Sequence, residues 1–215
     1  LTLYSVQGRG YRLACPLQWL DAARITSLLG EQGRHFHIEI LDSAPSTNSM
    51  LLQCAAQGAA SGSVLAVEWQ SGGRGRLGRS WHSALGNALT FSLLWRFDCG
   101  VSALSGLSLA AGVALIRGLH ALGVEGVHLK WPNDVLGAQD AKLAGTLIEA
   151  QGDMLGPSTV VIGIGLNLSL PQTMLQRIDQ SASSLADVVG EVPERNELLA
   201  VLLRELHGVL DAFPE

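Results

Sequence analysis

The segment "SVLAVEWQSGGRGRLGRSWHSALGNALTFSLLWRF", Ser63–Phe97, decides the fold class of this chain. Residues 63–70 form an apolar run that is typical of a buried strand, and residues 87–97 form a second one. Between them lies a glycine-rich segment with three arginines, Arg74, Arg76 and Arg79, which we call the arginine loop (residues 71–80). We therefore expect a strand, a basic loop and another strand.

The composition of the arginine loop also fits three other kinds of segment: a dinucleotide-binding loop, a kinase glycine loop and a solvated turn. Gly73–Gly78 has the GxGxxG spacing of dinucleotide-binding loops, with Asp98 as the candidate acidic residue, but that motif must open a helix. The glycine loop of protein kinases does lie between strands, yet the chain has no HRD or DFG sequence. A solvated turn would leave three neighbouring arginines to repel one another. Because arginine binds phosphate and carboxylate in a bidentate manner, the pattern favours an anion-binding loop that changes shape on binding.

Composition limits the classes of function. The 215 residues are 47% hydrophobic and only 15% charged, which predicts one domain with a large core. The apolar stretch 104–122 is interrupted by glycine and charge and predicts a buried helix, not a membrane span. The net charge of −5 disfavours a protein that binds nucleic acid over its whole surface. The two lysines, Lys130 and Lys142, bracket a single motif, which favours a local cationic pocket for a small anion.

Cysteine and histidine usage indicates a reducing compartment and no structural metal. Cys15, Cys54 and Cys99 are widely spaced and form no CxxC pair, so we expect reduced thiols in a cytosolic protein. The six histidines form no HExxH motif, and we expect no zinc site. The chain begins without Met, and we expect it to be cut from a longer protein.

Hydrophobic periodicity and turn residues predict the remaining elements. Helices are expected at 17–30, from Asn48 to a stop at Gly58 with Ser46 or Thr47 as N-cap, and at 102–122, 184–190 and 194–213. Strands are expected as a hairpin within 1–14, and at 35–41, 126–137 (strand, turn, strand), 142–152 and 158–170. This order predicts an α+β fold, a mixed β-sheet backed by helices.

Two further motifs contain polar residues at strand ends. In "LKWPNDVLGAQDAKLAG", Asn133 and Asp134 follow Pro132 at a turn, Lys142 lies across a hairpin, and Gly145 permits close backbone approach. An ordinary β-turn is the alternative explanation. "GIGLN" ends a buried strand at Asn167, which a capping role explains equally well.

Taken together, "STN", "GRGRLGRSW", "KWPNDV…KLAG" and "GIGLN" resemble the motifs of biotin protein ligases, which activate biotin with ATP and attach it to a lysine of a carrier protein. The likeness covers about residues 35–215 and implies a catalytic domain over 16–215 with the class II aminoacyl-tRNA synthetase/biotin ligase-like fold. Residues 1–15 resemble the last hairpin, or wing, of the winged-helix domain of bifunctional ligase-repressors. We expect the rest of that DNA-binding domain, and the SH3-like C-terminal domain of such ligases, to lie outside this chain.

The resemblance also implies roles for individual residues. The residues implied in binding biotin are Ser46, Thr47, Asn48, Gln70, Arg74, Gly75, Arg76, Lys142 and Gly145. Those implied in binding the nucleotide are Trp81, Asn133 and Asn167, and those implied in catalysis are Arg74, Arg76, Lys142 and Asp134. Asp134 would orient either the metal or the incoming amine, and the sequence leaves both open.

The implied chemistry accounts for the basic loop. A carboxylate must attack the α-phosphorus of ATP, and two unit charges about 4 Å apart repel by roughly 4 kcal/mol at an effective dielectric near 20. Arginines, Lys142 and a Mg²⁺ ion on the phosphates would cancel that repulsion. The implied partners are biotin, ATP, the biotin carboxyl carrier protein of acetyl-CoA carboxylase and a second copy of the chain, with no membrane and with operator DNA bound only through the domain outside this chain. A lipoate ligase or octanoyltransferase, a biotin-responsive repressor and a plain dinucleotide-binding module remain as alternatives.

Overall fold

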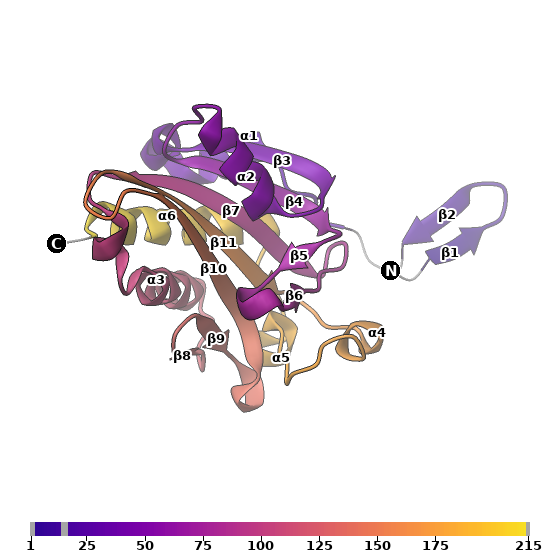
Figure 1. The fold of residues 1–215 in the computed structure, drawn as a ribbon. Helices are drawn as coiled ribbons and strands as arrows, with labels where there is room; N and C mark the ends of the chain where they lie inside the picture. Colours follow the sequence, from indigo (N-terminus) through magenta and orange to yellow (C-terminus); the bar gives the residue numbers. More distant parts are fainter. Residues whose placement is uncertain (1–2, 14–16, 214–215) are drawn as a thin grey trace.

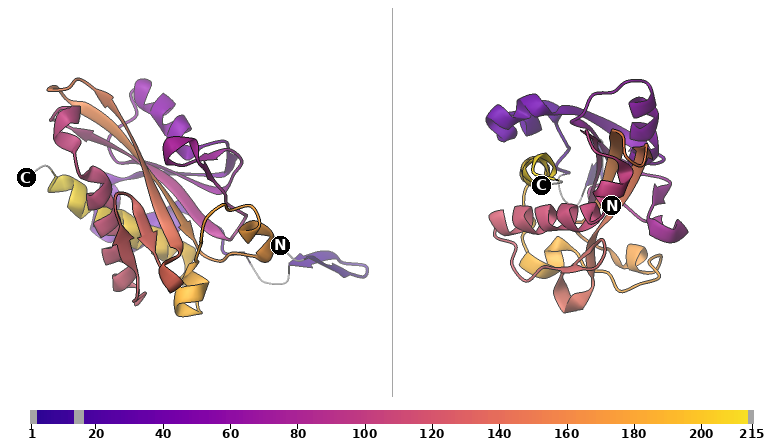
Figure 2. Two further views of the ribbon diagram at one scale, coloured as in Figure 1. Left: turned by 60° about the horizontal axis from the view of Figure 1, so that its bottom comes forward. Right: turned by 60° about the vertical axis from the view of Figure 1, so that its left-hand side comes forward.

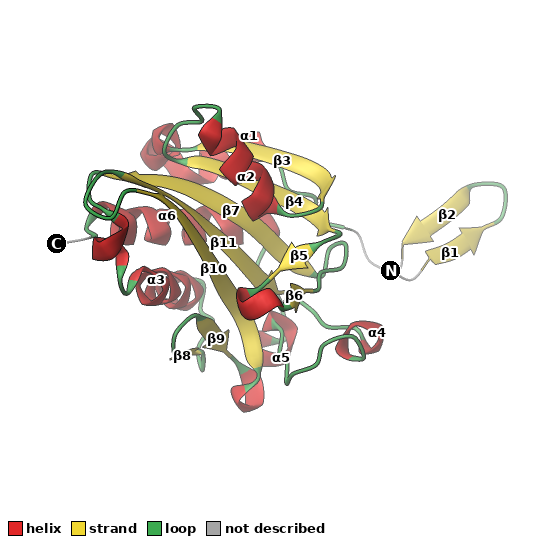
Figure 3. Cartoon of the chain, viewed as in Figure 1, coloured by secondary structure: helices red, strands yellow, loops and turns green. Residues whose placement is uncertain are grey.

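The computed structural model describes residues 3–13 and 17–213, so Cys15 lies outside the described residues. Its centre is a seven-stranded sheet in the order β3-β4-β7-β11-β10-β9-β8 (Figures 1 and 3). The strands are β3 His37–Ala44, β4 Ser63–Gln70, β7 Ala88–Phe97, β8 His128–Lys130, β9 Asp134–Leu136, β10 Lys142–Gly152 and β11 Ser158–Asn167. The pair β3 and β4 is parallel and all other pairs are antiparallel, so the expected mixed sheet is confirmed.

Helices cover both faces of the sheet (Figures 1 and 2). They are α1 Ala22–Leu29, α2 Thr47–Ala56, α3 Leu107–Ala121, α4 Gln172–Leu175, α5 Leu185–Val189 and α6 Arg195–Asp211. Helices α3 and α6 pack together against one face and form the main core with it, whereas α2 packs on the other face in a smaller cluster. Among the described residues, no helix has the length and apolar content that crossing a bilayer requires.

Two small hairpins complete the chain. Strands β1 Leu3–Val6 and β2 Gly10–Leu13 pair as the expected N-terminal hairpin, which Figure 1 shows apart from the sheet. Strands β5 Gly73–Arg74 and β6 Ser80–Trp81 pair within the arginine loop, on either side of a 3₁₀ turn at Arg76–Gly78. The loop therefore leads from β4 through this hairpin to β7, and the helix that a dinucleotide-binding motif requires does not follow it.

Side chains alternate between the two faces of the central strands: bulky apolar residues face α3 and α6, and small or polar residues face α2. In β7, Leu89, Phe91 and Leu93 are fully buried in the main core that includes α3 and α6. In β11, Ile162 and Ile164 belong to the same core. Because side chains alternate along a strand, the intervening residues face α2. These residues are polar or have no side chain, and they are Thr90, Ser92, Gly163 and Gly165.

Two expected helices begin later than predicted. Residues 17–21 are not helical, because the Leu20 N–H donates to Glu68 at 2.7 Å and the Asp21 N–H donates to Asn196 at 2.7 Å. Asp21 then caps α1 through the Arg24 N–H. These partners lie far away in the sequence, so periodicity within 17–30 could not reveal them.

The long helix expected at 102–122 is divided. Val101–Leu104 is a 3₁₀ turn, and Ser102 Oγ donates to the Met154 carbonyl at 2.6 Å. Gly106 has a φ of 93° and is the N-cap of α3, so the helix begins only at Leu107. In contrast, the cap at Ser46 and the positions of the predicted sheet strands are confirmed to within a few residues.

A buried ion pair joins the N-terminal segment, the sheet and α6. Arg195 Nη1 lies 2.6 Å from Glu68 Oε2, and the two side chains are 4% and 3% exposed. Arg195 also donates to the carbonyls of Gln18 and Ala88, while Glu68 accepts from the Leu20 N–H. Both charges are thus desolvated, and each has several hydrogen-bond partners, although Arg195 Nε has none among the described residues. Hydrogen bonds of this kind are what make a buried pair tolerable.

We predict that Arg195→Met lowers the free energy of unfolding by about 3–5 kcal/mol, because it leaves the Glu68 carboxylate buried without its cation. Urea denaturation at neutral pH measures this effect. Arg204→Met, on the exposed face of the same helix, is the control and should cost less than about 1 kcal/mol. Equal losses in the two variants would show that the pair is not a principal stabilising contact.

Candidate ligand-binding site

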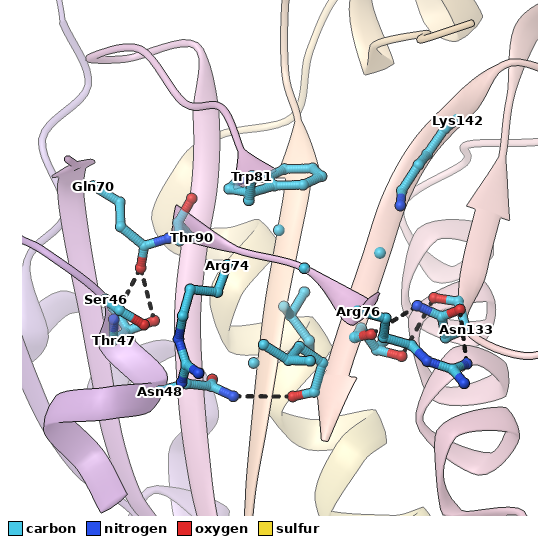
Figure 4. A pocket seen from close by; sticks show the side chains of 17 residues that line it. Ser46, Thr47, Asn48, Gln70, Arg74, Arg76, Trp81, Thr90, Asn133 and Lys142 are labelled. Atoms are coloured by element: carbon cyan, nitrogen blue, oxygen red, sulfur yellow. Dashed lines mark hydrogen bonds between the residues drawn. The ribbon is translucent and has the colours of Figure 1, made fainter. Parts of the chain in front are cut away.

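A cavity of about 470 Å³, its open mouth included, lies on the α2 face of the sheet (Figure 4). Its floor follows the strand register: one row runs Thr90–Gly165–Gly145 across β7, β11 and β10, and the next row runs Ser92–Gly163–Leu147. The floor is thus built largely from residues with small side chains or none.

At each glycine of the floor, a side chain from another part of the protein lies close to the place that a Cβ atom would occupy. A Cβ at Gly163 would overlap the Asn48 amide, and a Cβ at Gly165 would overlap the Trp81 ring. A Cβ at Gly145 would come within 3.0 Å of Lys142 Nζ. The glycines of "GIGLN" therefore allow close approach, and the groups that approach them are protein side chains.

One end of the cavity is lined by buried polar side chains that carry no charge of their own. Ser46 is the N-cap of α2, and Thr47 donates from both N–H and Oγ1 to Gln70 Oε1, at 2.9 and 3.2 Å. Ser92 Oγ lies 2.6 Å from Asn48 Oδ1. Within residues 3–13 and 17–213, Thr90 Oγ1 has no hydrogen-bond partner, although this side chain is only 5% exposed. This end can therefore accommodate a ligand head that forms hydrogen bonds.

The other end is cationic, and each cation already has a partner. Lys142 Nζ lies 2.8 Å from Asp134 Oδ1, with the two side chains 19% and 20% exposed. Arg76 Nη1 donates to Asn133 Oδ1 at 3.2 Å. Figure 4 shows Lys142, Arg76 and Asn133 on the opposite side of Trp81 from Ser46, Thr47 and Gln70.

Arg74 departs from the expected grouping of three cations. Figure 4 shows its side chain pointing away from Lys142. The guanidinium forms an ion pair with Glu149 on β10, at 2.7 Å. Glu149 was not foreseen because nothing around it in the sequence marks it; the contact depends on the loop crossing the sheet. Pairing with Glu149 and Asp134 limits the repulsion among the cations.

Most of the residues proposed from the sequence line one cavity. Those that line it are Ser46, Thr47, Asn48, Gln70, Arg74, Gly75, Arg76, Trp81, Asn133, Lys142 and Gly145. Asp134 and Asn167 are not among its lining residues. Asp134 holds Lys142, and Asn167 Nδ2 donates to the carbonyls of Ser183 and Lys142, at 3.0 and 3.4 Å, so that it supports the backbone beneath the lysine.

Several lining residues were missed. They are Thr90, Thr146, Leu147, Gly163, Ile164 and Gly165. The small-residue alternation in "LTFSL" and "VIGIGLN" is the signal that could have identified Thr90, Gly163 and Gly165, since it assigns one face of each strand to bulky residues and leaves the other without them.

These features define an α+β domain whose cavity suits a small molecule with a polar head and an anionic group. The chain belongs to the biotin/lipoate A/B protein ligase family, whose pattern it matches over residues 40–167. It is 37% identical to the bifunctional ligase/repressor BirA of Escherichia coli over 99% of its own length and 64% of that protein. It is 39% identical to a biotin–[acetyl-CoA-carboxylase] ligase of Mycobacterium tuberculosis, over 84% of this chain and 66% of that one.

The fold agrees with this assignment. The biotin protein ligase of Aquifex aeolicus in complex with biotin and ATP superposes with a TM-score of 0.67 at 28% identity, covering 82% of this chain and 71% of that one. The class II synthetase/biotin ligase-like fold expected from the sequence is therefore confirmed. The chain spans just under two thirds of the length of both curated relatives.

We predict that Gly163→Ala lowers the free energy of unfolding by about 1–3 kcal/mol, because the added methyl group displaces Asn48 and breaks its buried hydrogen bonds. Chemical denaturation provides the measurement. Gly208→Ala is the matched control: Gly208 lies in α6 with open space around it, and alanine there should stabilise by up to about 1 kcal/mol. A neutral Gly163→Ala would contradict the close packing of Asn48 on β11.

Proposed function

We propose that this chain catalyses the ATP-dependent activation of biotin to biotinyl-5′-AMP and the transfer of biotin to a lysine of a biotin carboxyl carrier protein. The observation that supports it best is the cavity itself, which joins an end lined by buried polar side chains to a cationic end across Trp81. The names of the relatives point to the same reaction.

The polar end favours biotin over lipoate, although the family includes ligases for both. The ureido ring of biotin offers one acceptor and two donors, which Ser46, Thr47, Asn48 and Gln70 would bind. A lipoyl ring has no such groups and would leave the buried Thr90 hydroxyl, which has no partner among the described residues, unpaired at a cost of roughly 1–3 kcal/mol. Sites built around hydrogen bonds reject ligands that lack them.

At the cationic end, the carboxylate of biotin would attack the α-phosphorus of ATP and pyrophosphate would leave. Lys142 would bridge the carboxylate and the α-phosphate, and Arg76 would neutralise charge on the same group. Relief of a repulsion of roughly 4 kcal/mol corresponds to about a thousandfold in rate. Trp81 would stack on adenine, and Asn133 would bind near the nucleotide. Asn167 would act indirectly, through the backbone that it holds.

The residues present fit a Mg²⁺ ion that arrives with ATP. Over the described parts of the chain, no three His, Cys, Asp or Glu side chains converge as a metal site. Magnesium needs no such cage, since it commonly binds through one or two carboxylates and substrate phosphates. Asp134 would supply the carboxylate, and the ion would reduce the negative charge of the phosphates. The alternative role for Asp134, orienting the incoming lysine amine, uses the same carboxylate.

For a longer protein that contains this chain, we propose cytoplasmic location, homodimer formation and biotin-responsive repression. The supporting observation is the hairpin β1–β2, which has the form of a wing and exposes Arg9 and Arg12. Operator binding would require the remainder of the DNA-binding domain. Electrophoretic mobility shifts of the longer protein, with and without biotin and ATP, would test this second function.

Biotin-dependent exchange of pyrophosphate into ATP tests the proposed reaction on this chain. We expect exchange with biotin and at least a hundredfold less with lipoate or octanoate. A preference for lipoate would assign the chain to the other branch of the family, and NAD(H) binding without exchange would support a dinucleotide-binding module.

We predict that Lys142→Ala lowers kcat/KM for biotin-dependent exchange by about a hundredfold or more, because charge that develops between carboxylate and phosphate loses its main cation. Lys130→Ala, at the other lysine of the chain, is the control and should retain exchange. Thermal melting separates this loss from unfolding. Wild-type kinetics in Lys142→Ala would remove this lysine from the site.

We predict that Arg76→Gly still forms biotinyl-5′-AMP but releases it faster, so that nearby lysines become labelled without selectivity. The cause is the loss of the contact to Asn133, which holds one side of the arginine loop. Release of radiolabelled adenylate is the readout. Arg79→Gly, a change of the same kind in the same loop, is the control. An unchanged release rate in Arg76→Gly would argue against a guarding role.

A further inference from the structure

Glu149 is the one acidic residue of β10, and its carboxylate connects two separate parts of the site. The same oxygen, Oε2, accepts from Asn48 Nδ2 at 2.9 Å and from Arg74 Nη2 at 2.7 Å. Asn48 belongs to α2 and Arg74 to the arginine loop. One carboxylate oxygen therefore joins the helix that forms the polar end to the loop that lies over the cavity.

The contact with Arg74 crosses the whole width of the cavity floor. The loop leaves the sheet at β4, whereas Glu149 stands on β10, and β7 and β11 lie between them. Backbone hydrogen bonds hold the base of the loop. Within the described part of the chain, the side chains of the loop form hydrogen bonds to two residues, Glu149 and Asn133. Of these two, only Glu149 is charged.

We propose that Glu149 is a positioning residue: it holds Arg74, and with it the arginine loop, across the cavity, and so helps to retain the activated intermediate. The first part rests on the contacts alone. The second part rests on the proposed function, because it requires that biotinyl-5′-AMP be formed in the cavity. The wider the loop opens, the more readily water reaches the mixed anhydride or the intermediate escapes.

Glu149→Gln separates this role from a purely structural one. A glutamine carbonyl occupies the same place and still accepts from Asn48, so the polar end keeps its hydrogen bonds. Only the charge that faces Arg74 is lost, and a charge-assisted hydrogen bond becomes a neutral one. Arg74→Gln breaks the same ion pair from the loop side and leaves Glu149 with Asn48 untouched. Glu39→Gln is the control for the change in net charge, because the Glu39 side chain is exposed on the edge strand β3.

Limited trypsinolysis of the ligand-free chain tests the positioning of the loop, with cleavage after Arg79 quantified by mass spectrometry. We expect the initial rate to rise about two- to fivefold in Glu149→Gln, as the loss of a partly exposed ion pair allows. Arg74→Gln should show the same rise, the double variant no further rise, and Glu39→Gln none. Cleavage in Glu149→Gln at the wild-type rate would overturn the proposal.

Retention is measured on the same variants as the rate at which labelled biotinyl-5′-AMP leaves the protein. We expect faster release in Glu149→Gln, with kcat for adenylate formation within about twofold of wild type, and partial recovery in Glu149→Asp. Faster cleavage with unchanged release would overturn the retention part. If the wild type forms no adenylate, the proposed function fails, while the trypsin experiment still decides whether Glu149 holds the loop.

Discussion

The site depends on three positions in β10 and β11 that have no side chain. At Gly145, Gly163 and Gly165 the sheet leaves space into which Lys142, Asn48 and Trp81 project. A larger residue at Gly163 or Gly165 would displace the Asn48 amide or the Trp81 ring, whereas at Gly145 it would meet the flexible end of Lys142. The cavity is thus produced by the sheet, and the surrounding loops and helix α2 supply chemistry to a space that the strands have left open.

Charge in this protein is arranged in two ways. Glu68 and Arg195 are desolvated, multiply hydrogen-bonded and fixed, and they belong to the architecture. Lys142 with Asp134 and Arg74 with Glu149 are partly hydrated pairs at the rim of the cavity. Of these two pairs, Lys142 with Asp134 lies at the cationic end, where an anionic ligand can take the place of the protein carboxylate on the lysine. Binding at the cationic end is therefore best understood as an exchange of partners.

Local signals in the sequence predicted the elements well where the deciding contacts are local. Ser46 caps α2 as expected, and the arginine loop lies between two strands. The failures share one cause. Leu20 and Asp21 are kept out of a helix by residues far along the chain, and Glu149 meets Arg74 across two intervening strands. For the site, the motifs identified most lining residues, but the directions of Arg74 and Asn167 depend on tertiary packing that spacing does not encode.

The separation between Glu68 and Arg195 also bears on biosynthesis. They are 127 residues apart in the sequence, so Glu68 leaves the ribosome long before Arg195 is synthesised. Until α6 emerges, enclosing β4 would strand an ionised carboxylate away from water, which is strongly unfavourable. The nascent sheet is therefore expected to stay hydrated and incomplete, and to close in one late step when the C-terminal helix arrives.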